Sequence, residues 1–212
     1  MDLSNRTIDI INMLSSHVQF INNNDFTPKQ NSCLDELYDK LIQGNKHVLA
    51  LKSNGNLTYK LRNITDLASK LQAGHFFPKH IRDDILSRIK KIHTYNVVLN
   101  DRAIQIEFAA YDKTSRKHLD LYVNMMLQWL YVCIQYADAN CAKTLKIFIF
   151  FTDYKKELPL TPNIVLGSSH VNTAYSYHCK PEGEIIIYRK EEWMKVFIHE
   201  TFHAFGLDFG FN

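Results

Sequence analysis

The hydrophobic pattern is clearest in the second half of the chain. Thr144–Phe151 (TLKIFIFF) is an almost continuous apolar run of strand length, which predicts a central strand buried on both faces. His118–Ala137 carries a long apolar stretch and predicts a helix, and a last helix is expected from about Lys190 to Phe205. Residues 170–177 (HVNTAYSY) alternate as an edge strand does. Further strands are expected at 96–99, 103–110, 163–166 and 184–188.

The first half of the chain contains shorter segments. Thr27-Pro28 is a typical helix start, and Gly44 is expected to end that helix. Ser53-Asn54-Gly55 contains an Asn-Gly turn signal, so residues 47–61 are predicted to form a β-hairpin. Other helices are expected at 5–20, 65–72 and 79–92. The pattern therefore predicts an α+β protein with two regions: residues 1–94, mostly helical with the hairpin, and residues 95–212, which mix strands and helices.

Composition excludes some classes of function. The 212 residues are 46% hydrophobic, enough to bury a sizeable core, and the formal net charge is only +3. The densest basic run, Ser87–His93 (SRIKKIH), alternates with isoleucine and is interpreted as the polar side of an amphipathic helix. No basic stripe suited to nucleic acid stands out, so no nucleic-acid partner is expected.

Cysteine usage and hydropathy bear on the compartment. The four cysteines form no CxxC pair, which argues against a cysteine-based zinc site, and Cys33 and Cys133 fit reduced thiols in a core. The apolar run Leu121–Ile134 is shorter than the roughly 20 residues of a membrane span, so no span is expected. The N-terminus lacks the pattern of a signal peptide. We therefore expect a cytoplasmic protein.

The residues with the strongest chemical signal are His199, Glu200 and His203. Histidines four apart on a helix lie on one face, one turn apart, where two ring nitrogens can bind one zinc ion. Glu200 directly follows the first histidine and is placed to take a proton from a metal-bound water as general base. The structural alternative is a pair of ordinary histidines on a helix.

Once these residues are noted, a family resemblance becomes visible. HETFHAFGLDF, residues 199–209, resembles the HExxHxxGxxH pattern of metzincins within the zincin metallopeptidases, especially the HExGHxxGLDH form of matrix metallopeptidases. The element order expected over residues 101–205 is similar to the N-terminal subdomain of a zincin, with a mixed twisted sheet, a backing helix and an active-site helix. The motif is also similar to uncharacterised metallopeptidase-like proteins of giant DNA viruses. The resemblance implies a zinc cofactor and a protein or peptide substrate.

Two departures from the metzincin pattern matter. Phe209 stands where the third histidine ligand would fall, and Asp208, one residue out of register, is the nearest possible third ligand. The zincin C-terminal subdomain has no counterpart before Asn212, so a further C-terminal fragment or a partner is expected to complete the site, unless the third ligand has been lost. His170 and His178, which flank the expected edge strand, are further candidates.

The expected edge strand suggests how substrate binds. Asn172, Thr173 and Ala174 lie on it, and its backbone groups would pair with an extended peptide; the alternative is an ordinary solvent-exposed edge. Two functions remain open. The first is a zinc-dependent peptidase with His199 and His203 as ligands and Glu200 as base. The second is a metallopeptidase-like structural or interaction protein with weak or no activity, such as a virion or assembly component.

Overall fold

A computed structural model describes residues 27–63, 71, 77–109, 115–157, 159, 161 and 165–208. The helices expected at 5–20 and 65–72, and the start of the strand expected at 163–166, lie outside the described residues. The chain divides into two compact units, Met1–Asp39 and Lys40–Asn212. The described part of the first unit contains the N-terminal turns of helix α2 (Pro28–Ser53).

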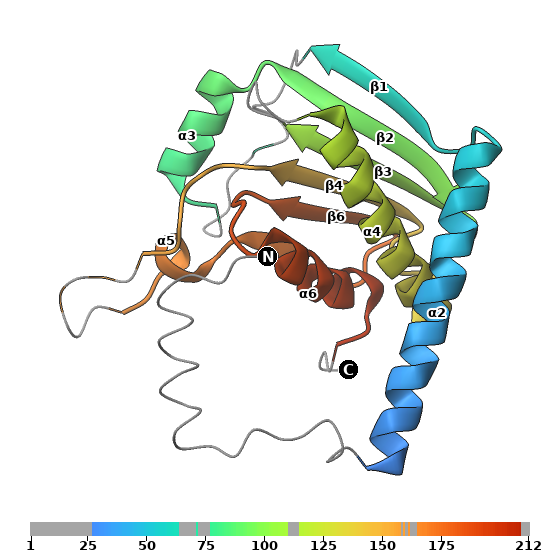
Figure 1. Ribbon diagram of the computed structural model, residues 1–212. Coiled ribbons are helices and arrows are strands. Elements are labelled where there is room, and N and C mark those ends of the chain that lie inside the picture. Colours follow the sequence, from blue (N-terminus) through green and yellow to red (C-terminus); the bar gives the residue numbers. More distant parts are fainter. Residues whose placement is uncertain are drawn as a thin grey trace. The chain divides into compact units, whose positions relative to one another are not determined.

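The described part of the second unit is built on a six-stranded mixed sheet with the strand order β1-β2-β3-β4-β6-β5 (Figure 1). The strands are β1 (Thr58–Asn63), β2 (Lys91–Leu99), β3 (Arg102–Ala109), β4 (Thr144–Phe150), β5 (Ala174–Ser176) and β6 (Glu182–Ile187). The three central strands β3, β4 and β6 run parallel, and β1, β2 and β5 pair antiparallel with their neighbours. The short strand β5 lies at one edge of this sheet.

The helices complete the α+β class that the sequence predicts. Beside α2 they are α3 (Lys79–Arg88), α4 (Arg116–Tyr136), the short α5 (Ser168–Val171) and α6 (Trp193–Phe205). Helix α4 makes the crossover between the parallel strands β3 and β4, as βαβ connections do. Helix α6 follows β6 directly and ends the described chain together with residues 206–208.

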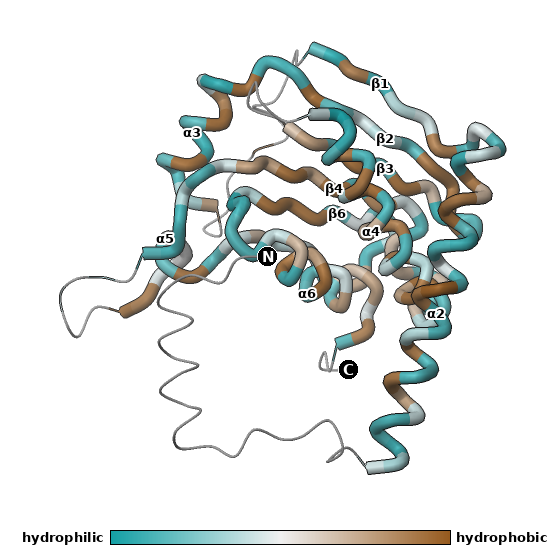
Figure 2. Tube along the Cα trace, in the orientation of Figure 1, coloured by the Kyte–Doolittle hydropathy of each residue, from teal (hydrophilic) through white to brown (hydrophobic). Residues whose placement is uncertain are grey.

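Two apolar clusters cover the two faces of the sheet. One face packs against α4, α6 and the C-terminal part of α2, with Leu127 of α4 and Phe205 of α6 fully buried (Figure 1). The other face carries Phe148, Ile186 and Tyr188 and packs against Ile81 and Ile85 of α3. The C-terminal halves of β4 (IFIF) and β6 (III) are continuously apolar and buried, which fits central strands covered on both faces (Figure 2).

The largest difference from the sequence-based expectation is α2, one continuous helix of 26 residues. It extends past Gly44, which was expected to end it, and replaces the first strand of the expected hairpin at 47–61. A Cβ atom at Gly44 would lie 2.9 Å from the backbone oxygen of Gln128, so this glycine permits close contact with α4. The Asn-Gly turn still exists at Gly55, with φ of 72°, but it connects α2 to β1.

The second difference concerns the basic run Ser87–His93. The expected helix at 79–92 ends at Arg88, and β2 begins at Lys91, so the run is a helix end followed by a strand and not one polar helix face. The boundary expected near residue 94 falls inside β2. Along β2 the side chains of Ile92 and Tyr95 are buried, because this strand is covered on both faces.

Most of the remaining predictions for the second half agree with the structure, but the edge strand expected at 170–177 does not: residues 168–171 form α5, and only Ala174–Ser176 form strand β5. The apolar run at 144–151 is β4, the long apolar stretch is α4, and the last helix is α6, which begins at Trp193. Among the described residues, no helix has the length and hydropathy needed to cross a membrane.

Candidate metal centre

Helix α6 presents the three motif residues in different environments. Its apolar face, with Phe197, Ala204 and Phe205, is fully buried against the sheet and fixes the rotation of the helix. On that helix Glu200 is 7% exposed, whereas His199 is exposed and His203 is half-buried. The helix ends at Gly206, whose φ of 65° is the left-handed conformation that commonly terminates helices.

The two histidines converge through their Nε2 atoms, which lie 3.1 Å apart. Two nitrogens bound to one tetrahedral zinc ion at about 2.0–2.1 Å lie roughly 3.3–3.4 Å apart. The observed pair is within a few tenths of an ångström of that separation. The donor set and its spacing therefore fit two corners of a zinc site, with His199 and His203 as the residues that would hold the ion.

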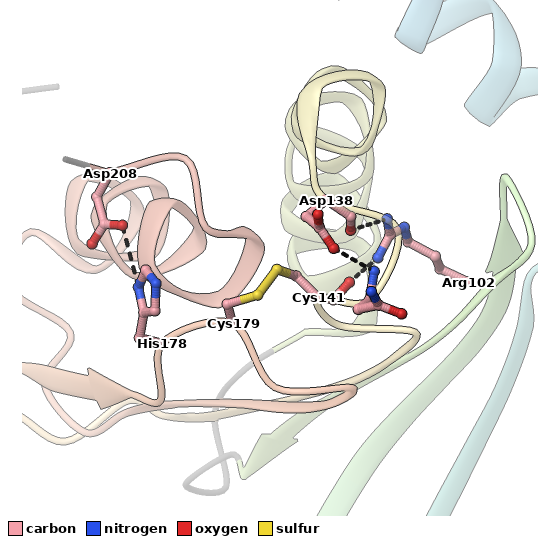
Figure 3. Close-up of a disulfide and its surroundings, with 7 residues drawn as sticks. Arg102, Asp138, Cys141, His178, Cys179 and Asp208 are labelled. Atoms are coloured by element: carbon pink, nitrogen blue, oxygen red, sulfur yellow. Dashed lines mark hydrogen bonds and ion pairs between the residues drawn. A yellow bond between two sulfur atoms is a disulfide. The ribbon is translucent and has the colours of Figure 1, made fainter. Parts of the chain in front are cut away.

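Asp208 contacts the opposite nitrogen of His203. Its Oδ2 lies within hydrogen-bond distance of His203 Nδ1, and its Oδ1 lies 3.3 Å from Nδ1 of His178 (Figure 3). Burial raises the pKa of Asp208, but the hydrogen bond from His203 and the nearby imidazoles outweigh it and hold the pKa below its usual value. An ionised carboxylate only accepts, so it selects the His203 tautomer with the proton on Nδ1 and the lone pair on Nε2.

This contact bears on the identity of the third ligand. The Asp208 oxygen that is hydrogen-bonded to His203 Nδ1 cannot also ligate an ion bound at His203 Nε2, because the two ring nitrogens point in different directions. Asp208 thus lies where carboxylates commonly orient a metal-bound imidazole from behind. Among the described residues, the one set of three potential ligands whose atoms converge within 4.8 Å is His178, His203 and Asp208, and it does not include His199.

Glu200 has a partner that sequence reasoning did not identify. Ser176, the last residue of β5, donates a hydrogen bond of 2.6 Å from its hydroxyl to Oε2 of Glu200. No short motif marks such a serine, because the contact depends on how the edge strand lies against α6.

A disulfide between Cys141 and Cys179 supports the C-terminal end of α6 (Figure 3). The backbone nitrogen of Cys179 donates to the carbonyl oxygen of His203 at 3.0 Å, and a Cβ at Gly206 would lie 3.2 Å from Cys141 Sγ. The loop that carries Cys141 is held by the buried guanidinium of Arg102, which donates hydrogen bonds to the backbone oxygens of Cys141 and Asp138. The two cysteines have a sequence separation of 38, so sequence spacing alone does not reveal the pair.

The other two cysteines are free thiols in different settings. Cys133 is buried, as a core thiol should be, whereas Cys33 is exposed and not part of a core. The prediction of two core thiols is therefore wrong for Cys33. Cys33 lies in the N-terminal part of α2, where residues 28–39 are all exposed.

The expected substrate strand is shorter than predicted. Ala174 begins β5, whereas Asn172 and Thr173 precede it. Thr173 is buried, and its carbonyl oxygen accepts a hydrogen bond of 3.0 Å from the backbone nitrogen of Tyr188. His170 lies in α5, where its Nδ1 accepts from the backbone nitrogen of Gly167 at 2.9 Å. His170 is therefore engaged locally, whereas Nδ1 of His178 lies 3.3 Å from Oδ1 of Asp208.

Comparison with known proteins gives no relative: no family model matches the chain, and no curated protein or solved structure matches it.

Proposed function

We propose that this chain is a zinc-dependent peptidase in which His199 and His203 hold the metal and Glu200 is the general base. The observation that carries the proposal is the 3.1 Å approach of the two Nε2 atoms on the helix face next to a buried carboxylate. When bound, zinc polarises the scissile carbonyl and makes water a nucleophile near neutral pH. A catalytic zinc site uses three protein ligands. We propose that the third comes from a partner or from a segment outside the described residues.

Two residues of the chain have further roles in the proposed reaction. Glu200 removes a proton from the attacking water and delivers it to the departing amine nitrogen. Asp208 keeps the lone pair of His203 on Nε2 through the bond at Nδ1. The water, not the protein, forms the new bond to carbon, so no covalent enzyme intermediate is needed.

The substrate proposed is an extended protein or peptide segment. Strand β5 is at the sheet edge, pairs with β6, and is held next to α6 by the contact between Ser176 and Glu200. A peptide added along this edge would pass beside the motif helix, which is the strand-addition mode of recognition. Ala174 and the preceding Asn172 and Thr173 are the proposed docking segment.

A second candidate function is a structural or interaction protein with the same fold and little activity, such as a virion or assembly component. It is favoured by the convergent set around Asp208, which omits His199 and therefore supplies no third ligand to the Nε2 pair among the residues described. The disulfide favours a virion over the cytoplasm as the working location, since disulfides persist in oxidising environments and at virion surfaces.

The test combines metal content with hydrolysis. The purified chain, prepared without chelator, is assayed for zinc by elemental mass spectrometry and for cleavage of a library of quenched fluorescent peptides. Glu200→Gln should keep the zinc and lower turnover by about 10²–10⁴-fold, the usual contribution of a general base. Replacing both His199 and His203 with Ala should remove the zinc. Glu182→Gln, the same change at an exposed carboxylate, is the matched control.

The outcomes separate the two functions. Equal turnover by Glu200→Gln and the unchanged chain would refute the role of Glu200. Zinc retained after loss of both histidines would place the metal elsewhere. Stoichiometric zinc without cleavage of any peptide would favour the structural function.

A further inference from the structure

We infer that Ser176 is a positioning residue that holds the carboxylate of Glu200 in the orientation needed for proton transfer; this inference rests on the proposed peptidase function. The geometry is a 2.6 Å hydrogen bond from Ser176 Oγ to Glu200 Oε2, made across the contact between the edge strand and the motif helix. Glu200 has three rotatable side-chain bonds, and its own helix does not fix all of them.

The alternation of side chains along β5 places the Ser176 hydroxyl on the face of the strand that packs against α6. Side chains along a strand point alternately to opposite faces, so Ala174 and Ser176 share one face and Tyr175 lies on the other. Tyr175 contacts Phe77 in the cluster on the α3 face, whereas Ala174 belongs to the cluster that includes α6. Ser176 is therefore on the α6 face, and its register opposite Ile185 of β6 sets its position along the helix.

Ser176 has a single hydroxyl proton, so it can donate a strong hydrogen bond to only one oxygen of Glu200. A serine hydroxyl has one proton, and two acceptors lie near it: Glu200 Oε2 at 2.6 Å and the Glu200 backbone oxygen at 3.3 Å. The shorter, charge-assisted contact is the stronger one. Ser176 thus occupies Oε2 and leaves Oε1 to accept the proton of water.

The same arrangement persists through the proton transfer. When Oε1 is protonated, Oε2 becomes a carbonyl oxygen and still accepts the hydroxyl proton of Ser176. Ser176 keeps its own proton throughout and forms no bond to substrate. Glu200 can then pass its proton to the amine while it keeps the hydrogen bond from Ser176.

The test uses a pair of variants that differ only in the hydroxyl. Ser176→Thr retains the donor, and Ser176→Val has nearly the shape of threonine without it. With zinc content equal in all three proteins, Ser176→Thr should keep kcat within about 3-fold. Ser176→Val should lower kcat about 10-fold, the value of one hydrogen bond, and leave KM unchanged.

A second measurement does not depend on turnover. A double-mutant cycle of Ser176→Val and Glu200→Ala on the full chain measures the coupling of the two side chains in unfolding. The unfolding equilibrium constant should show a coupling of at least about 3-fold.

Each result decides between the possibilities. Loss of kcat in Ser176→Val with rescue in Ser176→Thr, together with coupling in the cycle, supports the inference. Equal turnover of Ser176→Val and the unchanged chain, equal loss in both variants, or no coupling overturns the inference and leaves the proposed function intact. An unchanged chain that cleaves no peptide overturns the proposed function and this inference with it.

Discussion

The indole nitrogen of Trp129 donates a hydrogen bond of 2.8 Å to the hydroxyl oxygen of Thr201, and this bond connects α4 to α6. Thr201 is fully buried, and its own hydroxyl proton goes to the carbonyl oxygen of Ile198 at 2.6 Å. The hydroxyl therefore accepts and donates at once. Because Thr201 directly follows Glu200, the bond fixes the rotation of the motif helix next to the proposed general base.

The first prediction concerns this contact. Thr201→Val should lower the free energy of unfolding by about 1–3 kcal/mol, because the Trp129 donor is left buried without an acceptor. Thr201→Ser keeps the hydroxyl and should cost about 1 kcal/mol, the value of the lost methyl group. Urea unfolding followed by tryptophan fluorescence measures both. Equal stability of Thr201→Val and the unchanged chain would show that the bond contributes nothing.

The second prediction concerns Asp208. Its contact at His203 Nδ1 predicts that Asp208→Ala weakens zinc binding about 10–100-fold, the usual effect of losing a group that orients a ligand. Asp208→Asn keeps an acceptor oxygen and should weaken binding less. Competition with a chromophoric chelator gives the affinities, and Asp153→Ala, at an exposed carboxylate, controls for lost charge. Complete loss of stoichiometric zinc in Asp208→Ala would instead make Asp208 a direct ligand.

The third prediction concerns the disulfide. Replacing Cys141 and Cys179 with Ser opens a loop with a sequence separation of 38 residues. The loop-closure entropy for that length predicts a loss of about 4 kcal/mol in the free energy of unfolding. Denaturation of the double variant, and of the unchanged chain with and without reductant, provides the measurement. If reductant left the unchanged chain as stable as before, the disulfide would not contribute to its stability.

The fourth prediction concerns the free thiols. Burial raises the pKa of Cys133 to about 12, so at pH 8 roughly one thiol in ten thousand is the reactive thiolate. Cys33 is exposed. Alkylation of the native, non-reduced chain should label Cys33 alone, and alkylation after unfolding should add Cys133. Mass spectrometry of the peptides counts the labels, and rapid native labelling of Cys133 would contradict its burial.

Local pattern predicted α6 and the central strand β4 well, whereas the edge strand expected at 170–177 is only the three residues of β5. The period of α6 and the apolar run of β4 are properties of neighbouring residues, so the helix, the central strand and the His199–Glu200–His203 motif were readable from the sequence. Gly44 was misinterpreted as a helix end. A glycine is found there because the backbone of α4 packs closely against α2 at this position. No local signal distinguishes those two uses of glycine.

The supporting contacts of the site were harder to foresee for the same reason. Ser176 reaches Glu200 only because β5 pairs with β6 in one particular register. Cys141 meets Cys179 only because the loop after α4 lies beside the turn after β5. Both contacts are consequences of tertiary arrangement, which a single sequence does not encode in any short pattern.

The disulfide also determines the covalent topology of the molecule. The chain between the two cysteines passes through an exposed segment in which the side chain of Val165 is 89% exposed. Scission of the backbone there would create two polypeptides, yet the half-cystines on either side would keep them joined as one molecule. The motif helix would remain tethered to the strands before the break, as the two chains of a processed protein remain tethered after maturation.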